Sequence, residues 1–172
     1  MKKGEESVKI IILGSENAGL YRDIRLQALK GHPEAFSSSF EEESAYTLER
    51  FSSRLNEDFS FTFGALMEDQ LIGMVTLVTE RRNKLKHRAN IAAMYVDPEY
   101  RRSGIGKKLL EEAIKKAKEL EGIEQIYLSV TSTNEAAIKL YLSLGFTTYG
   151  KDIKALKINN RYYDEDLMAI YF

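Results

Sequence analysis

The chain has 172 residues, a formal net charge of −1 and no cysteine. The balanced charge argues against a protein built mainly for nucleic acid, and the absence of cysteine excludes disulfides, thiolate metal sites and a cysteine nucleophile. With two histidines a multi-histidine metal site is not expected, and no apolar run is long enough to predict a membrane span or an export signal. We therefore expect a cytoplasmic protein with one domain over residues 1–172, whose first residues, 1–7, form a frayed tail.

The first half of the chain shows strand and helix patterns in turn. Val8–Leu13 is rich in β-branched residues and predicts a strand, and Asn17–Lys30 has the apolar spacing of a helix. Thr47–Glu57 predicts a second, shorter helix. Phe61–Met67 and Leu71–Thr79 predict two strands that a polar turn connects.

The second half begins with a strand–helix–strand–helix order. Ala89–Val96 predicts a strand, and Lys107–Leu120 has the clearest amphipathic helix pattern of the chain. Gln125–Val130 predicts a short strand, and Asn134–Leu144 predicts another helix.

Two late strands complete the order. Lys154–Ile158 and Leu167–Phe172 are predicted strands around the turn-forming pair Asn159-Asn160. No repeat or linker divides the chain, so the mixed order predicts an α/β or α+β domain around one sheet.

A glycine-rich loop lies between a predicted strand and a predicted helix. It reads Arg101-x-x-Gly104-x-Gly106, which lacks the spacing of a P-loop and the third glycine of a dinucleotide fingerprint. Backbone N–H groups at a helix start favour an anion, and the glycines keep side chains out of its way. The loop therefore fits a pyrophosphate, although a tight turn with solvated basic residues explains the same letters.

Two longer segments resemble the GNAT superfamily of acyl-CoA-dependent N-acetyltransferases, in its bacterial small-molecule form. The first segment, Met94–Ala117, carries the matching residues Val96, Pro98, Arg101, Gly104 and Gly106. The second segment, Ile126–Phe146, carries Asn134, Ala137, Leu140, Tyr141, Gly145 and Phe146. Two ordered segments at the usual separation are more specific than either one alone.

The resemblance implies a fold and a set of binding residues. The fold is a mixed, mostly antiparallel sheet flanked by helices, with a V-shaped splay between the strands at 89–96 and 125–130. Acetyl-CoA is the implied co-substrate, without a metal. Its implied binding residues are Met94, Tyr95, Val96, Arg101, Arg102, Ser103, Gly104, Ile105, Gly106, Lys107 and Asn134.

The implied reaction is direct attack of a neutral primary amine on the thioester. A backbone N–H near Val96 is the candidate donor to the oxyanion, and the Tyr141 hydroxyl is the candidate acid for the departing thiolate. No covalent enzyme intermediate is needed, in agreement with the absence of cysteine. Taken alone, Tyr141 also fits a core aromatic residue, and Asn134 also fits a helix N-cap.

The base that deprotonates the amine is left open. Many family members place a glutamate on the strand before the loop, but Ala89–Val96 contains no carboxylate. The candidates elsewhere are ordered water, Glu41, Glu42, Glu43 and His87. The three glutamates also fit a solvated helix start or loop, and His87 fits a surface position.

The acceptor is also left open. Glu41–Glu43, Tyr46 and Tyr162–Asp164 together could form an acidic, aromatic pocket for a cationic amine, or Tyr162–Asp164 could be an exposed side of a hairpin. Polyamines, aminoglycosides, amino acids and protein N-termini or lysines all fit. A small-molecule amine is the leading hypothesis, with a homodimer through the late strands as a further possibility and no membrane partner.

Three other functions stay as alternatives. One is a non-catalytic module that senses CoA or another nucleotide, and another is a protein or peptide N-acetyltransferase. Nucleic-acid binding through Arg81–Arg88 and the glycine-rich loop is disfavoured by the balanced charge.

Overall fold

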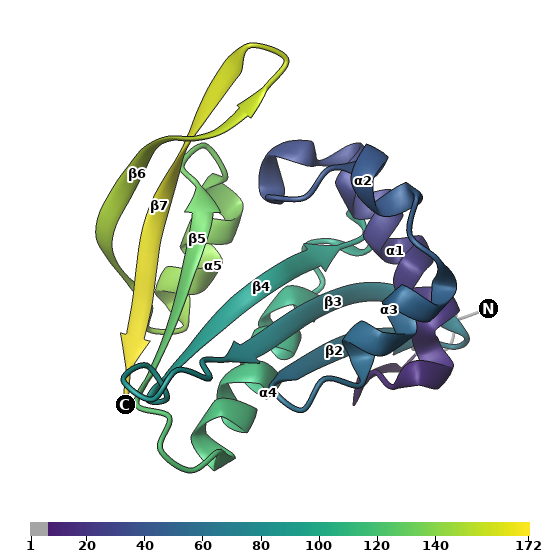
Figure 1. The fold of residues 1–172 in the computed structure, drawn as a ribbon, viewed down its shortest axis with the longest axis horizontal. Coiled ribbons are helices and arrows are strands. Elements are labelled where there is room, and N and C mark those ends of the chain that lie inside the picture. Colours follow the sequence, from purple (N-terminus) through teal and green to yellow (C-terminus); the bar gives the residue numbers. More distant parts are fainter. Residues whose placement is uncertain (1–6) are drawn as a thin grey trace, which may run out of the picture.

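A seven-stranded sheet runs through the computed structural model, which describes residues 7–172 (Figure 1). Its strand order is β1-β2-β3-β4-β5-β7-β6, and every neighbouring pair is antiparallel except the parallel pair β4–β5. The predicted α/β fold with a mostly antiparallel sheet is confirmed. The strands are β1 (Val8–Ile12), β2 (Ser60–Met67), β3 (Gln70–Thr79), β4 (Arg88–Val96), β5 (Gln125–Thr131), β6 (Thr147–Ile158) and β7 (Arg161–Tyr171).

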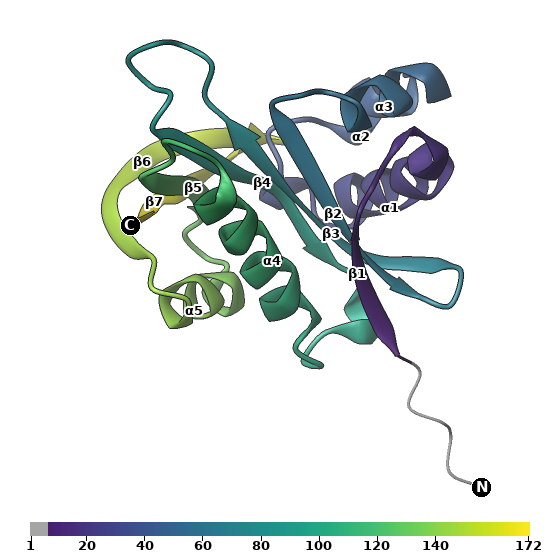
Figure 2. The same cartoon turned by 90° about the horizontal axis from the view of Figure 1, so that it is seen from below.

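Helices cover both faces of the sheet. Figure 2 shows α4 and α5 on one face and α1, α2 and α3 on the other. The helices are α1 (Ala18–Gly31), α2 (Phe40–Ser44), α3 (Leu48–Leu55), α4 (Ile105–Glu119) and α5 (Glu135–Ser143), with short 3-10 turns η1 (Ser15–Asn17), η2 (Pro33–Ala35) and η3 (Pro98–Tyr100). In the described part of the chain, no helix is both long and apolar enough to cross a bilayer.

Each face of the sheet has its own hydrophobic core. On one side the apolar stripe of α4, with Leu109 and Leu110 fully buried, packs on strand residues such as Ile126. On the other side α1 and α3 pack Leu29 and Phe51 against the sheet. The alternation of side chains along the central strands directs one set into each core, which fixes the strand register.

The strands β4 and β5 pair for a short distance and then separate. Arg88–Asn90 pairs with Gln125–Tyr127, and beyond these residues β4 and β5 no longer pair with each other. β4 also carries a bulge, since its register against β3 shifts between Ala92 and Tyr95, and Ala93 inside it has a φ of 53°. Bulges bend a strand and often lie next to active sites. The predicted splay is therefore confirmed.

Three element predictions differ from the structure. The late strands begin earlier, at Thr147 and Arg161, because polar residues on exposed strands hide the alternation that marks a strand. The predicted turn at Asn159-Asn160 is confirmed, with φ of 48° and 64° as a type I′ turn requires. The helix α4 begins at Ile105 rather than Lys107, and the short helix α2 was not predicted. The predicted tail lies outside the described residues, apart from Ser7.

A buried ionic triad joins α1, α2 and α3. The carboxylate of Glu43 has no exposed side-chain area and accepts hydrogen bonds from Arg25 at 2.9 and 3.0 Å and from Arg54 at 3.0 Å. Burial alone would raise the pKa of Glu43, but hydrogen bonds from both arginines and their positive charges outweigh it and lower the pKa to about 2. The three helices are thus held together by one ionised carboxylate.

We expect Glu43→Gln to lower the free energy of unfolding by about 3 kcal/mol near neutral pH, because it leaves two arginines without their counter-charge. The folded-state pKa lies below the unfolded one, so this stabilisation is present above the unfolded value and is lost as the pH falls toward 2. Urea unfolding at several pH values measures it. Glu41→Gln, at an exposed position of the same helix, is the control that should change little, and an equal loss in both variants would contradict the account.

Candidate active site

A cleft with a volume of about 620 Å³ opens where β4 and β5 separate. Its walls come from η2, the end of β4, the glycine-rich loop with the start of α4, the end of β5, and α5. All of the predicted binding and catalytic residues except Ser103 line it: Met94, Tyr95, Val96, Arg101, Arg102, Gly104, Ile105, Gly106, Lys107, Asn134 and Tyr141. The Ser103 hydroxyl instead donates to the backbone carbonyl of Tyr100.

Two glycines shape the start of α4 for different reasons. Gly104 is the N-cap of the helix and has a φ of 80°, a left-handed conformation that costs little only for glycine. Gly106 lies where a Cβ would meet Met94 Cε at 3.1 Å and Leu140 Cδ2 at 3.3 Å. The missing side chain at Gly106 therefore lets the helix start approach β4 and α5, while Gly104 turns the chain into the helix.

The end of β4 turns a backbone edge toward the cleft. The N–H of Asp97 donates to the carbonyl of Ile72 in β3, so the preceding residue, Val96, directs its N–H and C=O to the opposite side. The Arg101 side chain occupies this edge, since its Nε donates to the Val96 carbonyl at 2.9 Å. A ligand that pairs with the strand end would therefore meet both Val96 and Arg101.

The helix α5 contributes Asn134 and Tyr141 to the cleft. The Asn134 side chain accepts from the N–H of Ala137 at 3.2 Å, so this residue caps the helix as well as lining the cleft. Tyr141 is 5% exposed, and its ring packs edge-on against Phe146 at 5.8 Å between centroids. Burial raises the pKa of Tyr141, so its hydroxyl keeps its proton at neutral pH and can act as a donor.

The four side chains considered as bases, Glu41, Glu42, Glu43 and His87, lie away from the cleft. Glu43 is held by two arginines, and Glu42 accepts from the N–H and hydroxyl of Ser39 as part of a capping box. Hydrogen bonds from Ser39 lower the pKa of Glu42. His87 directly precedes β4 at the end opposite Val96, about 30 Å away along an extended strand. None of these residues, nor Glu41, lines the cleft.

The acidic, aromatic pocket considered above does not form at the cleft. The ring of Tyr46 lies under the guanidinium of Arg50 at 3.5 Å. On the late hairpin, Asp164 accepts from the Lys154 N–H at 2.9 Å, and Tyr162 is 48% exposed beside lysines. These residues serve local contacts, which matches the alternative of an exposed hairpin side.

Several residues that the sequence patterns did not indicate also line the cleft, among them His32, Glu34 and Thr131. His32 and Glu34 come from the turn after α1, and Thr131 comes from the end of β5. The Thr131 hydroxyl donates to the backbone carbonyl of Glu34 at 2.5 Å, which ties the turn to β5. The sequence "GHP" predicted only the end of a helix, so no local signal pointed to these side chains.

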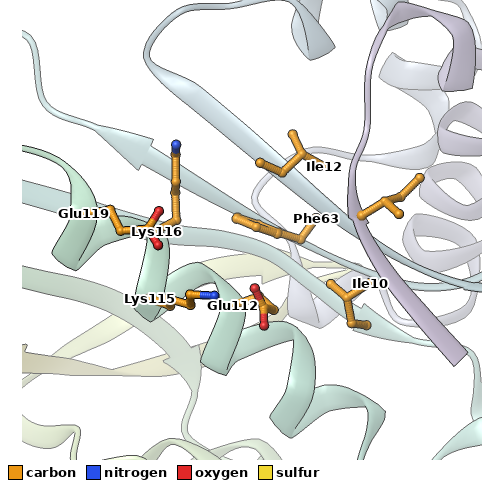
Figure 3. Close-up of a pocket in the computed structure, with 8 residues that line it drawn as sticks. Ile10, Ile12, Phe63, Glu112, Lys115, Lys116 and Glu119 are labelled. Atoms are coloured by element: carbon orange, nitrogen blue, oxygen red, sulfur yellow. The ribbon is translucent and has the colours of Figure 1, made fainter.

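A smaller cavity of about 170 Å³ lies between β1 and α4 (Figure 3). Ile10, Ile12 and Phe63 form its floor, and lysines and glutamates of α4 surround it. No predicted site residue lines it. In residues 7–172, no group of three or more histidine, aspartate and glutamate side chains is placed to hold a metal ion.

Comparisons with known proteins match the part of the chain that contains the cleft-lining residues. The acetyltransferase (GNAT) family matches residues 26–146. Human N-alpha-acetyltransferase 30 is 34% identical over 84 residues, a match that spans 49% of this chain and 23% of the human protein. The chain thus spans less than a quarter of that relative.

Solved structures share the fold over almost the whole chain. A GNAT-family acetyltransferase from Streptococcus pneumoniae superimposes with a TM-score of 0.86 at 23% identity, covering 96% of this chain and 100% of the other. An acetyltransferase from Salmonella typhimurium, solved with its cofactor acetyl-CoA, has a TM-score of 0.79 at 19% identity and covers 96% of this chain and 94% of the other. With the family match over residues 26–146, these findings show that the chain belongs to the acetyltransferase (GNAT) family.

Proposed function

We propose that the protein transfers the acetyl group of acetyl-CoA to a primary amine, with a small-molecule amine as the leading acceptor. The observation that carries this proposal is one cleft that holds the Val96 strand end, the glycine-bounded start of α4 and the Tyr141 hydroxyl. The Val96 strand end can bind an amide-rich arm, the start of α4 can bind a pyrophosphate, and the Tyr141 hydroxyl can donate to a departing thiolate.

The cleft suits the chemistry of coenzyme A. The first turn of α4 offers backbone N–H groups that lack partners inside the helix, and a helix start favours negative charge. Arg101, Arg102 and Lys107 line the same part of the cleft and add positive charge. The end of β4, Met94–Val96, can pair with a pantetheine arm as a neighbouring strand would, with the Val96 N–H left for the thioester carbonyl. The acetyl-CoA complex of the Salmonella typhimurium acetyltransferase supports this assignment.

The same residues account for the transfer step. The amine nitrogen attacks the thioester carbonyl carbon, and the Val96 N–H donates to the oxygen on which negative charge develops. As the carbon–sulfur bond breaks, the Tyr141 hydroxyl donates its proton to the sulfur. The raised pKa of Tyr141 keeps its proton on the oxygen at neutral pH, so the hydroxyl is present as a donor when negative charge develops on the sulfur.

A second acceptor class, the α-amine of a protein or peptide, is favoured by the likeness to an N-alpha-acetyltransferase. A homodimer and a cytoplasmic location stay predictions, and β6 is the outer strand through which the late hairpin would pair.

Thiol release from acetyl-CoA, measured with polyamines, amino acids, aminoglycosides and peptides with free N-termini or lysines, tests the activity and separates the acceptors. Acetyl-CoA binding without transfer to any of them would favour the sensing alternative.

We expect Gly106→Val to lower acetyl-CoA affinity at least about tenfold, because the new side chain overlaps Met94 and Leu140 and narrows the cleft. Calorimetry measures the affinity. Gly19→Val is the matched control, since Gly19 is also in a helix but has open space at its Cβ position. Unchanged affinity in Gly106→Val, with helix content like that of the control, would contradict the assignment of the loop.

Tyr141→Phe removes the hydroxyl and keeps the packing against Phe146. We expect kcat to fall about 100-fold with little change in the KM for acetyl-CoA, as is typical for loss of a general acid. Steady-state kinetics measure both constants, with Tyr171→Phe, at a position that is 62% exposed, as the control. A kcat of Tyr141→Phe equal to that of the wild type would show that Tyr141 serves only in packing.

A further inference from the structure

The cleft contains a small set of groups that can take a proton from an ammonium ion. Neither β4 nor β5 carries a carboxylate between Arg88 and Val96 or between Gln125 and Thr131. Among the lining residues in the described part of the chain, His32 is the one with an imidazole and Glu34 is the one with a carboxylate. His32 lies between α1 and η2, and Glu34 lies in η2.

His32 is held at the end of β4 by its contacts. Its Nε2 lies 3.1 Å from Arg101 Nη2, and its ring centroid lies 5.9 Å from that of Tyr95. Because a guanidinium can only donate, Nε2 accepts this bond, and the neutral ring carries its proton on Nδ1. Nδ1 faces the Glu34 carboxylate at 3.9 Å. The side chain is 32% exposed, so an acceptor can reach it.

One guanidinium connects His32 to the reacting end of the cleft. Arg101 donates through Nε to the Val96 carbonyl at 2.9 Å and through Nη2 to His32. The accepting nitrogen of His32 is therefore separated from the Val96 backbone by the width of a single guanidinium. An amine that attacks a thioester held at Val96 comes within reach of that nitrogen.

We infer that His32 is the general base of the reaction and that Arg101 covers its Nε2 until coenzyme A binds. This inference rests on the proposed acetyl transfer. Arg101 is also one of the cations available to the pyrophosphate, so binding of the cofactor draws its guanidinium away and uncovers Nε2. The Glu34 carboxylate then faces the charge that His32 acquires.

His32 is preferred to Glu34 as the base on chemical grounds. A carboxylate is ordinarily a much weaker base than an imidazole, and the proton must come from an ammonium group of still higher pKa. Glu34 lies on the far side of the ring, next to Nδ1, where a carboxylate orients the imidazole and stabilises its protonated form. The charged or titratable groups that face His32 are thus Arg101, Glu34 and Tyr95.

The proton and electron balance is complete without another reactant. His32 Nε2 takes one proton from the ammonium group, and the freed lone pair forms the nitrogen–carbon bond. The carbon–sulfur bond breaks with its electron pair on sulfur, which takes the proton of Tyr141. The second nitrogen proton returns to the Tyr141 oxygen, and His32 releases its proton to solvent.

His32→Gln and His32→Ala separate the base from a structural role. A glutamine oxygen can still accept from Arg101, but it cannot take up the proton. We expect kcat of His32→Gln to fall about 100-fold while acetyl-CoA affinity by calorimetry stays unchanged. In the wild type we expect kcat/KM to fall toward acid pH and to level off at higher pH. In His32→Gln we expect kcat/KM instead to keep rising with pH, in step with deprotonation of the free amine. His87→Gln, at the opposite end of β4, is the matched control.

A second measurement needs no turnover. With ¹⁵N-labelled histidine, the chain gives signals from two side chains, and His87→Gln assigns them. Adding CoA without an acetyl group should shift the Nε2 signal of His32, because the bond from Arg101 is lost, and should leave the His87 signals in place.

Each outcome decides the inference. Full kcat with an unchanged pH profile in His32→Gln overturns it, and so does an Nε2 signal that CoA does not move. Activity retained in His32→Gln but lost in His32→Ala assigns His32 to positioning Arg101 instead. If the wild type transfers acetyl to no amine, the proposed function fails first, and the histidine signals still report whether CoA uncovers Nε2.

Discussion

The separation of β4 from β5 is the constraint on which the rest of the structure depends. A strand that leaves its neighbour exposes backbone donors and acceptors, and groups shielded from water need partners. At Val96 the carbonyl finds one in the Arg101 side chain, which also comes from the loop that starts α4. The backbone edge that β5 leaves unpaired, the helix start and the guanidinium that contacts this edge are therefore brought together by one divergence in the sheet.

The surrounding elements keep this opening in shape. On the α5 side, Leu140 and Tyr141 pack beside the start of α4, where Gly106 leaves room for close approach. On the other side, the triad of Glu43 with two arginines fixes α1 against α2 and α3, and α1 ends directly before His32. An interaction that stabilises the fold thus sets the position of a side chain in the cleft.

Much of this arrangement was predictable from the sequence because it depends on local patterns. The glycines at 104 and 106 and the apolar stripe of α4 are local, and the resemblance joined them to Asn134 and Tyr141. The contact of His32 with Arg101 spans 69 residues and depends on how α1 crosses the sheet, which no local pattern encodes. The pairing of Glu43 was hidden for the same reason, since three adjacent glutamates look alike until the fold buries one of them.

The strand end at Val96 and the start of α4 form the proposed cofactor site. Amide hydrogen exchange with and without acetyl-CoA tests this proposal most directly, residue by residue. We predict slower exchange at Val96 and over Gly104–Lys107, with Ala89 and Asn90 unchanged because β4 is paired on both sides there. Protection confined to the cavity between β1 and α4, with no change at Val96 or in the loop, would contradict it.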